Sequence, residues 1–306
     1  MIASDNVPYI LGHSDAEISR LQTQAAILRP ITERLLRNAG IRSGMRVLDV
    51  GTGAGDVAIL AAQLVGPNGS VVGIDPNGSV VGIDPNRTVV AKAGERARSA
   101  GLRHVVFQEG TAETFSDDTG FDLVVGRYVL IHQTDPVTFL QAAARLARPG
   151  ASITFHELRL LETCPSVPRV PLWDMIDRLI RLAFSTALPH YDAGDRLIEH
   201  FRNAGLPEPS VFCETHIWGT ADAPHYAWMV HTLRSLLPQL RRIQAVGEEF
   251  VGIDSLEARL RNAVLTSRSQ VAGPPQICAW VRTSRLMKVM GPMPQQTENS
   301  GNRRTK

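Results

Sequence analysis

Hydrophobic and polar positions follow a repeated strand and helix pattern over residues 46–157. Short β-branched runs bounded by turn residues predict strands at 46–50, 104–108, 121–127 and 152–157, with a further VVGID strand between the first two. Apolar residues at helical spacing predict helices at 56–65, 87–99 and 136–147. Repeated βα units of this kind predict an α/β fold with a doubly wound, mostly parallel sheet.

Two helices are predicted before the first strand. Ser14 and Glu17 match the capping box that begins a helix, and apolar residues follow at helical spacing up to Leu28. Pro30 suits the first turn of a second helix, which Gly40 ends. These helices precede the α/β region and are expected to form a lid.

The chain after the fifth strand departs from the regular alternation. The segment WDMIDRLIRLAF predicts an inserted helix, and a helix at 193–204, a strand at 209–218, two more helices and a strand at 276–283 follow. Late strands of this kind can pair antiparallel at a sheet edge. We therefore expect a helical lid (1–40), an α/β core (41–160), a helical cap insertion (161–192), the rest of the core with a helical insertion (193–288) and a mobile tail (289–306).

Composition excludes several classes of protein. The 306 residues are 43% hydrophobic and 20% charged, with a formal net charge of +2, which argues against a disordered or strongly polyanion-binding chain. We therefore expect no nucleic-acid partner. Without a long apolar run or a signal-peptide pattern, no membrane association is expected and a cytoplasmic location is predicted. Three scattered cysteines without a CxxC motif predict reduced, structural thiols.

The first candidate chemistry is a glycine loop directly after the strand at 46–50. Gly51, Gly53 and Gly55 let the backbone turn sharply and approach a ligand where a Cβ atom would collide. The alternative is an ordinary glycine-rich turn. The context favours a ligand site, because the loop opens a helix and a later strand ends in an aspartate that can accept hydrogen bonds from ribose hydroxyls.

Two ligands suit such a unit, a dinucleotide and S-adenosylmethionine. A dinucleotide motif has its third glycine one residue later, where this chain has Asp56, and Asp56 would repel a pyrophosphate at the helix N-terminus. S-adenosylmethionine has no phosphate and carries a sulfonium and an ammonium group, which Asp49 and Asp56 tolerate. The charges therefore favour the sulfonium cofactor.

The segment NGSVVGIDP occurs twice in tandem, at 68–76 and 77–85, and only one copy can form the second strand. If the first copy is used, Asp75 is the ribose acid and nine residues loop out beside the cofactor. If the second is used, Asp84 is the acid and the surplus falls at the opposite sheet edge, where insertions cost little. We favour Asp84 over Asp75. The identical copies could also exchange register.

Five motifs now carry a specific resemblance: VLDVGTGAG, VVGIDPN, EGTAETF, FDLVVGRYVLIHQTDP and LARPGASITFHE. In this order and spacing, residues 45 to about 158 resemble class I S-adenosylmethionine-dependent methyltransferases, which implies a seven-stranded Rossmann-like sheet. The preceding YILGHSDAEISRLQTQA is similar to the N-terminal lid of bacterial relatives of the quinone-biosynthesis methyltransferases.

The resemblance also implies cofactor contacts. Asp49 and the three glycines would surround the methionine part of the cofactor, and Ala112 would lie beside the adenine. Thr111 stands where many members carry an acid that contacts the adenine amino group, and its hydroxyl can still accept a hydrogen bond.

Three further residues are expected at the carboxyl edge of the sheet, where ligands bind in open α/β folds. Arg127 is placed beside the cofactor and His132 near the methyl transfer site, with a surface salt bridge and helix packing as their respective alternatives. His156 is a candidate general base or a structural hydrogen-bonding residue. A base is not required, since a sulfonium leaving group is already activated.

The resulting hypothesis is methyl transfer to a small apolar or aromatic acceptor. Candidate acceptor-binding residues share a large apolar or aromatic side chain: Trp173, Met175, Phe184, His190, Tyr191, Trp228 and Met229. Two alternatives stay open, a non-catalytic S-adenosylmethionine-binding or regulatory protein of the same fold and a nicotinamide-dependent oxidoreductase. No metal site is expected.

Overall fold

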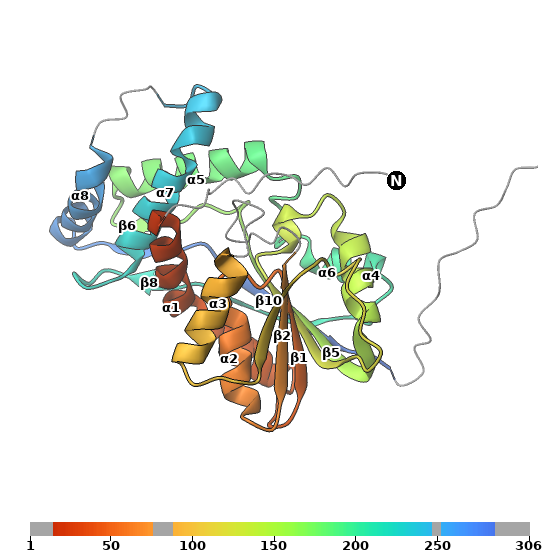
Figure 1. The fold of residues 1–306 in the computed structure, drawn as a ribbon. Helices are drawn as coiled ribbons and strands as arrows, with labels where there is room; N and C mark the ends of the chain where they lie inside the picture. Colours follow the sequence, from red (N-terminus) through yellow and green to blue (C-terminus); the bar gives the residue numbers. More distant parts are fainter. Residues whose placement is uncertain (1–14, 76–87, 247–251, 285–306) are drawn as a thin grey trace, which may run out of the picture.

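A computed structural model describes residues 15–75, 88–246 and 252–284 (Figure 1). The predicted capping box at Ser14, the tail from 289 and Asp84 lie outside these ranges. No helix within the described ranges has the length and apolar character needed to cross a membrane.

A seven-stranded sheet forms the centre of the molecule, in the order β3-β2-β1-β4-β5-β10-β7. Its strands are β1 (Arg46–Val50), β2 (Ser70–Asp75), β3 (Val105–Glu109), β4 (Phe121–Arg127), β5 (Ala147–Leu158), β7 (Ser210–Glu214) and β10 (Gln276–Arg282). The first five strands are parallel, and β10 runs antiparallel to both β5 and β7. The doubly wound, mostly parallel fold with late strands at one edge is therefore confirmed.

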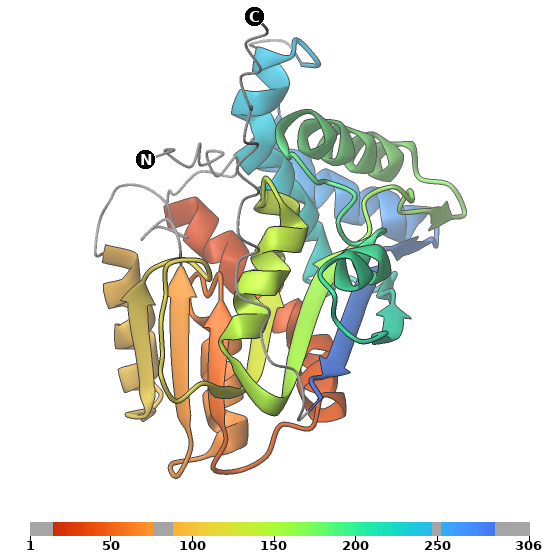
Figure 2. The same ribbon diagram turned by 90° about the vertical axis from the view of Figure 1, so that its right-hand side faces the viewer.

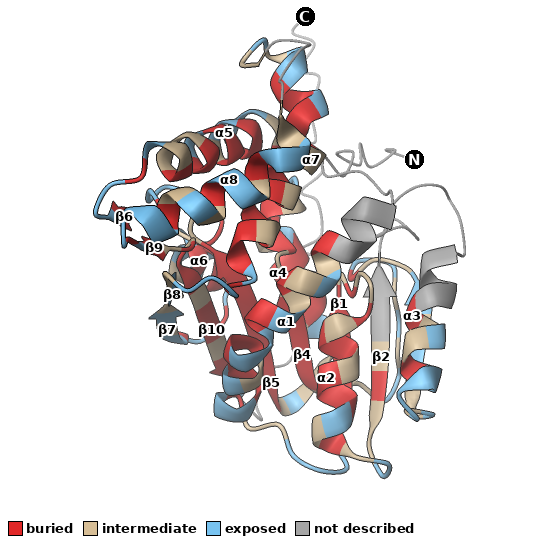
Figure 3. Ribbon diagram, turned by 90° about the vertical axis from the view of Figure 1, so that its left-hand side faces the viewer, coloured by how far each residue is buried: buried red, intermediate tan, exposed pale blue. Residues whose placement is uncertain are grey.

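Helices cover both faces of this sheet (Figures 1 and 3). On one face lie α1 (Asp15–Asn38), α2 (Asp56–Val65) and α3 (Thr88–Ser99), and on the other lie α4 (Pro136–Arg145) and α6 (Leu197–Asn203). The remaining helices are α5 (Pro171–Ala187), α7 (His225–Arg242) and α8 (Ile253–Thr266). In Figure 2 they gather beyond the carboxyl ends of the parallel strands.

Local signals explain where several elements begin and end. The Asp135 carboxylate accepts hydrogen bonds from the backbone N–H groups of Val137 and Thr138 at 3.0 and 3.1 Å, so it caps α4 as expected. Gly66, with a φ of +67°, ends α2 and bonds back to the Ala62 carbonyl. The strands are apolar on both sides because helices cover both faces of the sheet.

Two predicted boundaries are wrong. Helix α1 is continuous through Pro30, which lacks only one backbone donor, while its buried stripe of Leu28, Ile31 and Leu35 continues across that position. The strand expected at 209–218 divides into β7 and β8 (Ile217–Trp218). Strand β8 pairs with β9 (Gln270–Ala272), which also pairs with β6 (Ser166–Val167), in a second three-stranded sheet.

The repeated segment is a third correction. Strand β2 is formed by the first copy, paired with β1 from Arg46↔Ser70 to Val50↔Ile74. The preference for the second copy is therefore wrong, and Asp75 stands at the carboxyl end of the second strand. The two copies offer identical pairing, and the first requires only the short connection between Gly66 and Ser70, which has the smaller closure entropy.

Candidate active site

The glycine loop between β1 and α2 has the backbone geometry that only glycine adopts easily. Gly51, Gly53 and Gly55 have φ angles of +70°, +59° and +81°. A Cβ atom on Gly51 would lie 2.6 Å from Val129 Cγ2, and one on Gly55 would lie 2.8 Å from the Phe107 ring. The loop is therefore held close to its neighbours on one side and stays open to a cavity on the other.

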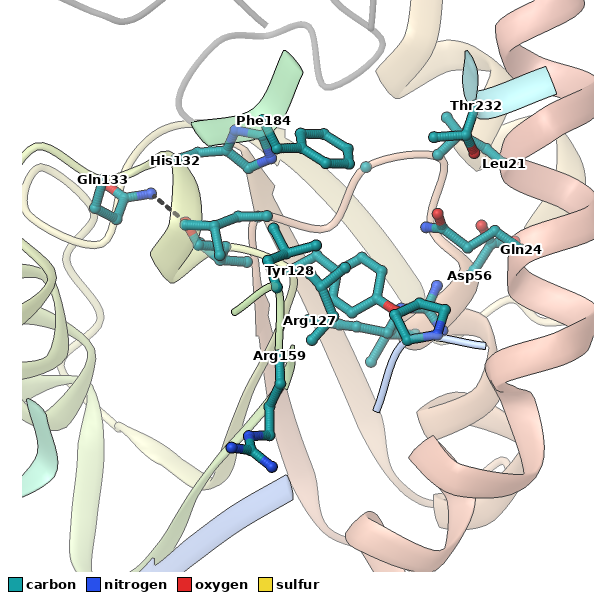
Figure 4. Close-up of a pocket in the computed structure, with 18 of the residues that line it drawn as sticks. Leu21, Gln24, Asp56, Arg127, Tyr128, His132, Gln133, Arg159, Phe184 and Thr232 are labelled. Carbon is teal, nitrogen blue, oxygen red and sulfur yellow. Dashed lines mark hydrogen bonds between the residues drawn. The ribbon is translucent and has the colours of Figure 1, made fainter. Parts of the chain in front are cut away.

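A cavity of about 420 Å³ lies over this loop (Figure 4). Its walls come from α1, the glycine loop, the ends of β4 and β5, α5 and α7. Of the predicted site residues, five line it: Gly51, Gly53, Thr111, Arg127 and His132. The structure therefore brings together residues at or after the carboxyl ends of three strands, β1, β3 and β4, at one sheet edge.

Asp49 lies below the loop, with only 1% of its surface exposed. One carboxylate oxygen accepts a hydrogen bond from Thr52 Oγ1 at 2.8 Å, and Thr52 lines the cavity. The other oxygen has no partner within the described ranges. Burial raises the pKa of Asp49 to about 7. Asp49 does not itself line the cavity, so its ionised carboxylate would favour a cation above the loop by charge and not by direct contact.

Asp56 has a partner that sequence reasoning missed. Its carboxylate pairs with Arg96 on α3 at 2.5 Å, and Arg96 also donates to the Ala54 carbonyl within the glycine loop. The ion pair offsets the negative charge at this helix end. Asp56 therefore repels an anion less strongly than the sequence alone predicts.

Thr111 and Ala112 follow β3. The Thr111 hydroxyl accepts hydrogen bonds from the backbone N–H groups of Glu113 and Thr114 at 3.2 and 3.1 Å, so it stabilises the local turn. Ala112 is buried and does not line the cavity. Whether either residue contacts an adenine stays a prediction.

His156 does not line the cavity, which contradicts the general-base interpretation. Its ring is fully buried, with Nδ1 3.0 Å from Thr32 Oγ1 on α1 and Nε2 3.0 Å from Gln276 Oε1 on β10. Burial is the main cause that lowers the pKa of His156 to about 3. Both ring nitrogens are used, so His156 is a neutral structural link between the helix and the sheet.

Arg127 and His132 do reach the cavity. Arg127 donates to Thr32 Oγ1 at 3.4 Å and forms no ion pair within the described ranges. His132 ends a short 3-10 helix, η1 (Leu130–His132), and burial lowers its pKa to about 4. A neutral imidazole and an arginine that pairs with no carboxylate of the described residues thus face the open space (Figure 4).

Tyr128 is a cavity residue that sequence reasoning did not single out. It has a φ of +57°, and its hydroxyl donates to Gln276 Oε1 at 2.5 Å. Glu157 supports the same turn, because its carboxylate accepts from the N–H groups of Val129 and Leu130, both at 2.9 Å. Nothing local in the sequence signals this conformation, since its partners lie on β5 and β10.

The candidate acceptor residues divide between cavity and core. Phe184, Trp228 and Met229 line the cavity. Trp173 is fully buried and donates to the Cys164 carbonyl at 2.8 Å, and His190 contacts the Thr134 carbonyl at 3.2 Å. Met175 and Tyr191 pack against the core. The cavity also contains polar residues that were not predicted: Arg20, Gln24, Arg159, Glu162, Asp177 and Arg181.

Comparison with known proteins agrees with this geometry. Residues 41–173 match the family model described as methyltransferase domain. The solved structure of the YcgJ protein from Bacillus subtilis shares the fold, with a TM-score of 0.52 and 17% identity over 83% of this chain and 97% of that one. The match and the shared fold thus identify residues 41–173 as a region similar to methyltransferase domains, on a sheet of the Rossmann-like methyltransferase type.

Two curated relatives have named activities. An arsenite methyltransferase from Aquipseudomonas alcaligenes is 31% identical over 119 residues, which are 38% of this chain and 33% of the relative. A demethylmenaquinone methyltransferase from Anoxybacillus flavithermus is 30% identical over 125 residues, which are 40% of this chain and 48% of the relative. The chain therefore spans about half, or less, of these two relatives.

Proposed function

We propose that this protein transfers the methyl group of S-adenosylmethionine to a small, flat and largely apolar acceptor. The observation that carries the proposal is the single cavity, which extends from the glycine loop to Phe184, Trp228 and Met229. One end has the glycine backbone, with the buried Asp49 beneath it, which suits a cationic cofactor. The other end has the aromatic and apolar walls that suit the acceptor.

When bound, the cofactor supplies an electrophilic methyl group on a sulfonium. The chain's own residues would bind and orient the two reactants. Gly51 and Gly53 would allow close approach of the cofactor, and Asp49, which lies behind Thr52, would favour its positive charge. The aromatic wall would exclude water. His132 is neutral at pH 7 and has a low pKa, which suits hydrogen bonding to an acceptor better than strong-base catalysis.

The cavity chemistry favours a quinol-like acceptor over arsenite, the two acceptor classes that the relatives suggest. Trivalent arsenic is soft and favours several thiolate ligands. Cys164 lines the cavity, whereas Cys213 and Cys278 do not, and burial raises the pKa of the Cys164 thiol. A single protonated thiol is a poor site for arsenite, while aromatic walls suit a ring.

A non-catalytic binding role is the second candidate. It is favoured by Thr111, which stands where many methyltransferases carry an acid and whose hydroxyl is already used by the backbone N–H groups of Glu113 and Thr114. The two roles separate in one experiment. Native mass spectrometry and a thermal shift with S-adenosylhomocysteine test binding, since a ligand at 100 times its dissociation constant adds about 2.7 kcal/mol of stability. Labelled S-adenosylmethionine is then offered with hydroquinones, phenols and arsenite. No binding at millimolar ligand refutes the proposal, and binding without turnover supports the second candidate.

A further inference from the structure

Gln24 on α1 is a nearly buried amide in the cavity wall, with 8% of its surface exposed. Its Oε1 atom accepts hydrogen bonds from Arg20 Nη1 at 2.8 Å and from Trp228 Nε1 at 3.4 Å. Both donors are themselves held in the wall formed by α1 and α7. The amide oxygen is therefore the common acceptor of an arginine and an indole.

These two donors fix which way the amide faces. If the amide turned over, its NH2 group would meet two donors and both hydrogen bonds would be lost. Gln24 Nε2 must then point away from Arg20 and Trp228, and Figure 4 shows the end of the amide extending from α1 into the cavity. Within the described ranges, both hydrogen bonds of the Gln24 amide end at Oε1 and none starts from Nε2.

The surroundings make this donor selective. Leu21, Met229 and Phe184 contribute apolar surface to the same cavity. Among the acids that line the same cavity, Asp56 is paired with Arg96, Asp177 with Arg181 and Glu162 with Arg159. A donor facing an apolar space is costly to bury unless the ligand brings an acceptor.

We infer that Gln24 is a specificity-determining residue that donates a hydrogen bond from Nε2 to an oxygen on the methyl acceptor. The class of acceptor is a flat apolar ring system with a carbonyl or phenolate oxygen, and pure hydrocarbons of the same shape are disfavoured. This inference rests on the proposed function, because it assigns the acceptor end of the same cavity.

The test compares 1-tetralone with tetralin, which share a bicyclic skeleton and differ by one carbonyl oxygen. Binding of each is measured by equilibrium dialysis with saturating S-adenosylhomocysteine. Gln24→Glu keeps an oxygen toward Arg20 and Trp228 and replaces the inward-facing NH2 by an oxygen. Gln63→Glu is the matched control, since Gln63 also accepts from an α1 arginine, Arg29, at 2.7 Å but lies outside the cavity.

We expect wild type and Gln63→Glu to bind the ketone more tightly than the hydrocarbon. Gln24→Glu should weaken ketone binding about tenfold and leave hydrocarbon binding unchanged. An unchanged ketone preference in Gln24→Glu, or failure of wild type to bind either probe, overturns the inference. The inference is also overturned if Gln24→Glu weakens the binding of S-adenosylhomocysteine and not that of the ketone, because the amide would then contact the cofactor. Loss of S-adenosylhomocysteine binding by wild type would refute the proposed function itself.

Discussion

Replacement of Gly51 by alanine tests the glycine loop directly. The residue has a φ of +70°, which costs an L-residue about 1–2 kcal/mol. The new Cβ atom would also lie 2.6 Å from Val129 Cγ2, well inside normal carbon contact. Val129 cannot move freely, because its N–H is held by the Glu157 carboxylate at 2.9 Å. Overpacking adds about 1–3 kcal/mol, so the sum is about 2–5 kcal/mol.

Gly101→Ala separates the two contributions. Gly101 has a φ of +73° and nothing within 4 Å of its Cβ position, so it should lose only the backbone share of about 1–2 kcal/mol. The double variant Gly51→Ala/Val129→Ala should be about 1–3 kcal/mol more stable than the sum of the two single losses predicts. The reason is that Val129→Ala removes the methyl groups that collide with the new Cβ atom.

The assay is urea denaturation followed by tryptophan fluorescence, with S-adenosylhomocysteine affinity measured in parallel. Gly51→Ala should lose both stability and affinity, whereas Gly101→Ala should keep the wild-type affinity. Equal losses of stability in Gly51→Ala and Gly101→Ala, or strict additivity with Val129→Ala, would refute the close contact between the loop and Val129.

Three further predictions concern carboxylates. Asp75→Asn should weaken S-adenosylhomocysteine binding by about 1.5–3 kcal/mol and Asp84→Asn should not, and titration calorimetry showing the reverse would assign the ribose to the second copy. Because ligand ammonium favours ionised Asp49, whose pKa is about 7, wild-type affinity should fall up to about tenfold per unit as the pH drops below 7. This slope should vanish in Asp49→Asn and persist in the exposed control Asp118→Asn. Burial raises the pKa of Glu157 from 4.5 to about 8, so the folded state binds more protons than the unfolded state between these values. The unfolding free energy of wild type should therefore fall relative to Glu157→Gln as the pH rises from 4.5 to 8, and parallel pH curves for the two proteins would contradict the raised pKa.

The local parts of the fold were predictable from the sequence. The strand at 46–50, the helix at 56–65 and the strand at 121–127 match the structure, because each is bounded by glycine, proline or a capping residue within a few positions. The glycine loop was predictable for the same reason. Its sharp, cavity-lining backbone needs only three glycines between a strand and a helix.

What could not be predicted depends on partners far along the chain. From the sequence, His156 is a histidine at the carboxyl end of a strand. In the structure, its ring forms hydrogen bonds with Thr32 and Gln276, which are 124 and 120 residues away. The repeated NGSVVGIDP presents two identical strands, so no side-chain pattern separates Asp75 from Asp84. Only the length of the connection from α2 distinguishes the copies.

Polar groups around the cavity fall into two sets with different consequences. His156 and Gln276 use each other as partners, and they link α1 and β10 to Tyr128 without lining the cavity. Gln24 and Arg127 keep donor capacity on the cavity side within the described ranges. Buried polar groups whose partners are all within the protein stabilise a unique packing, whereas those left open need a ligand. The reactants should therefore carry their oxygens toward Gln24 and Arg127, while substitutions at His156 should change stability before they change specificity.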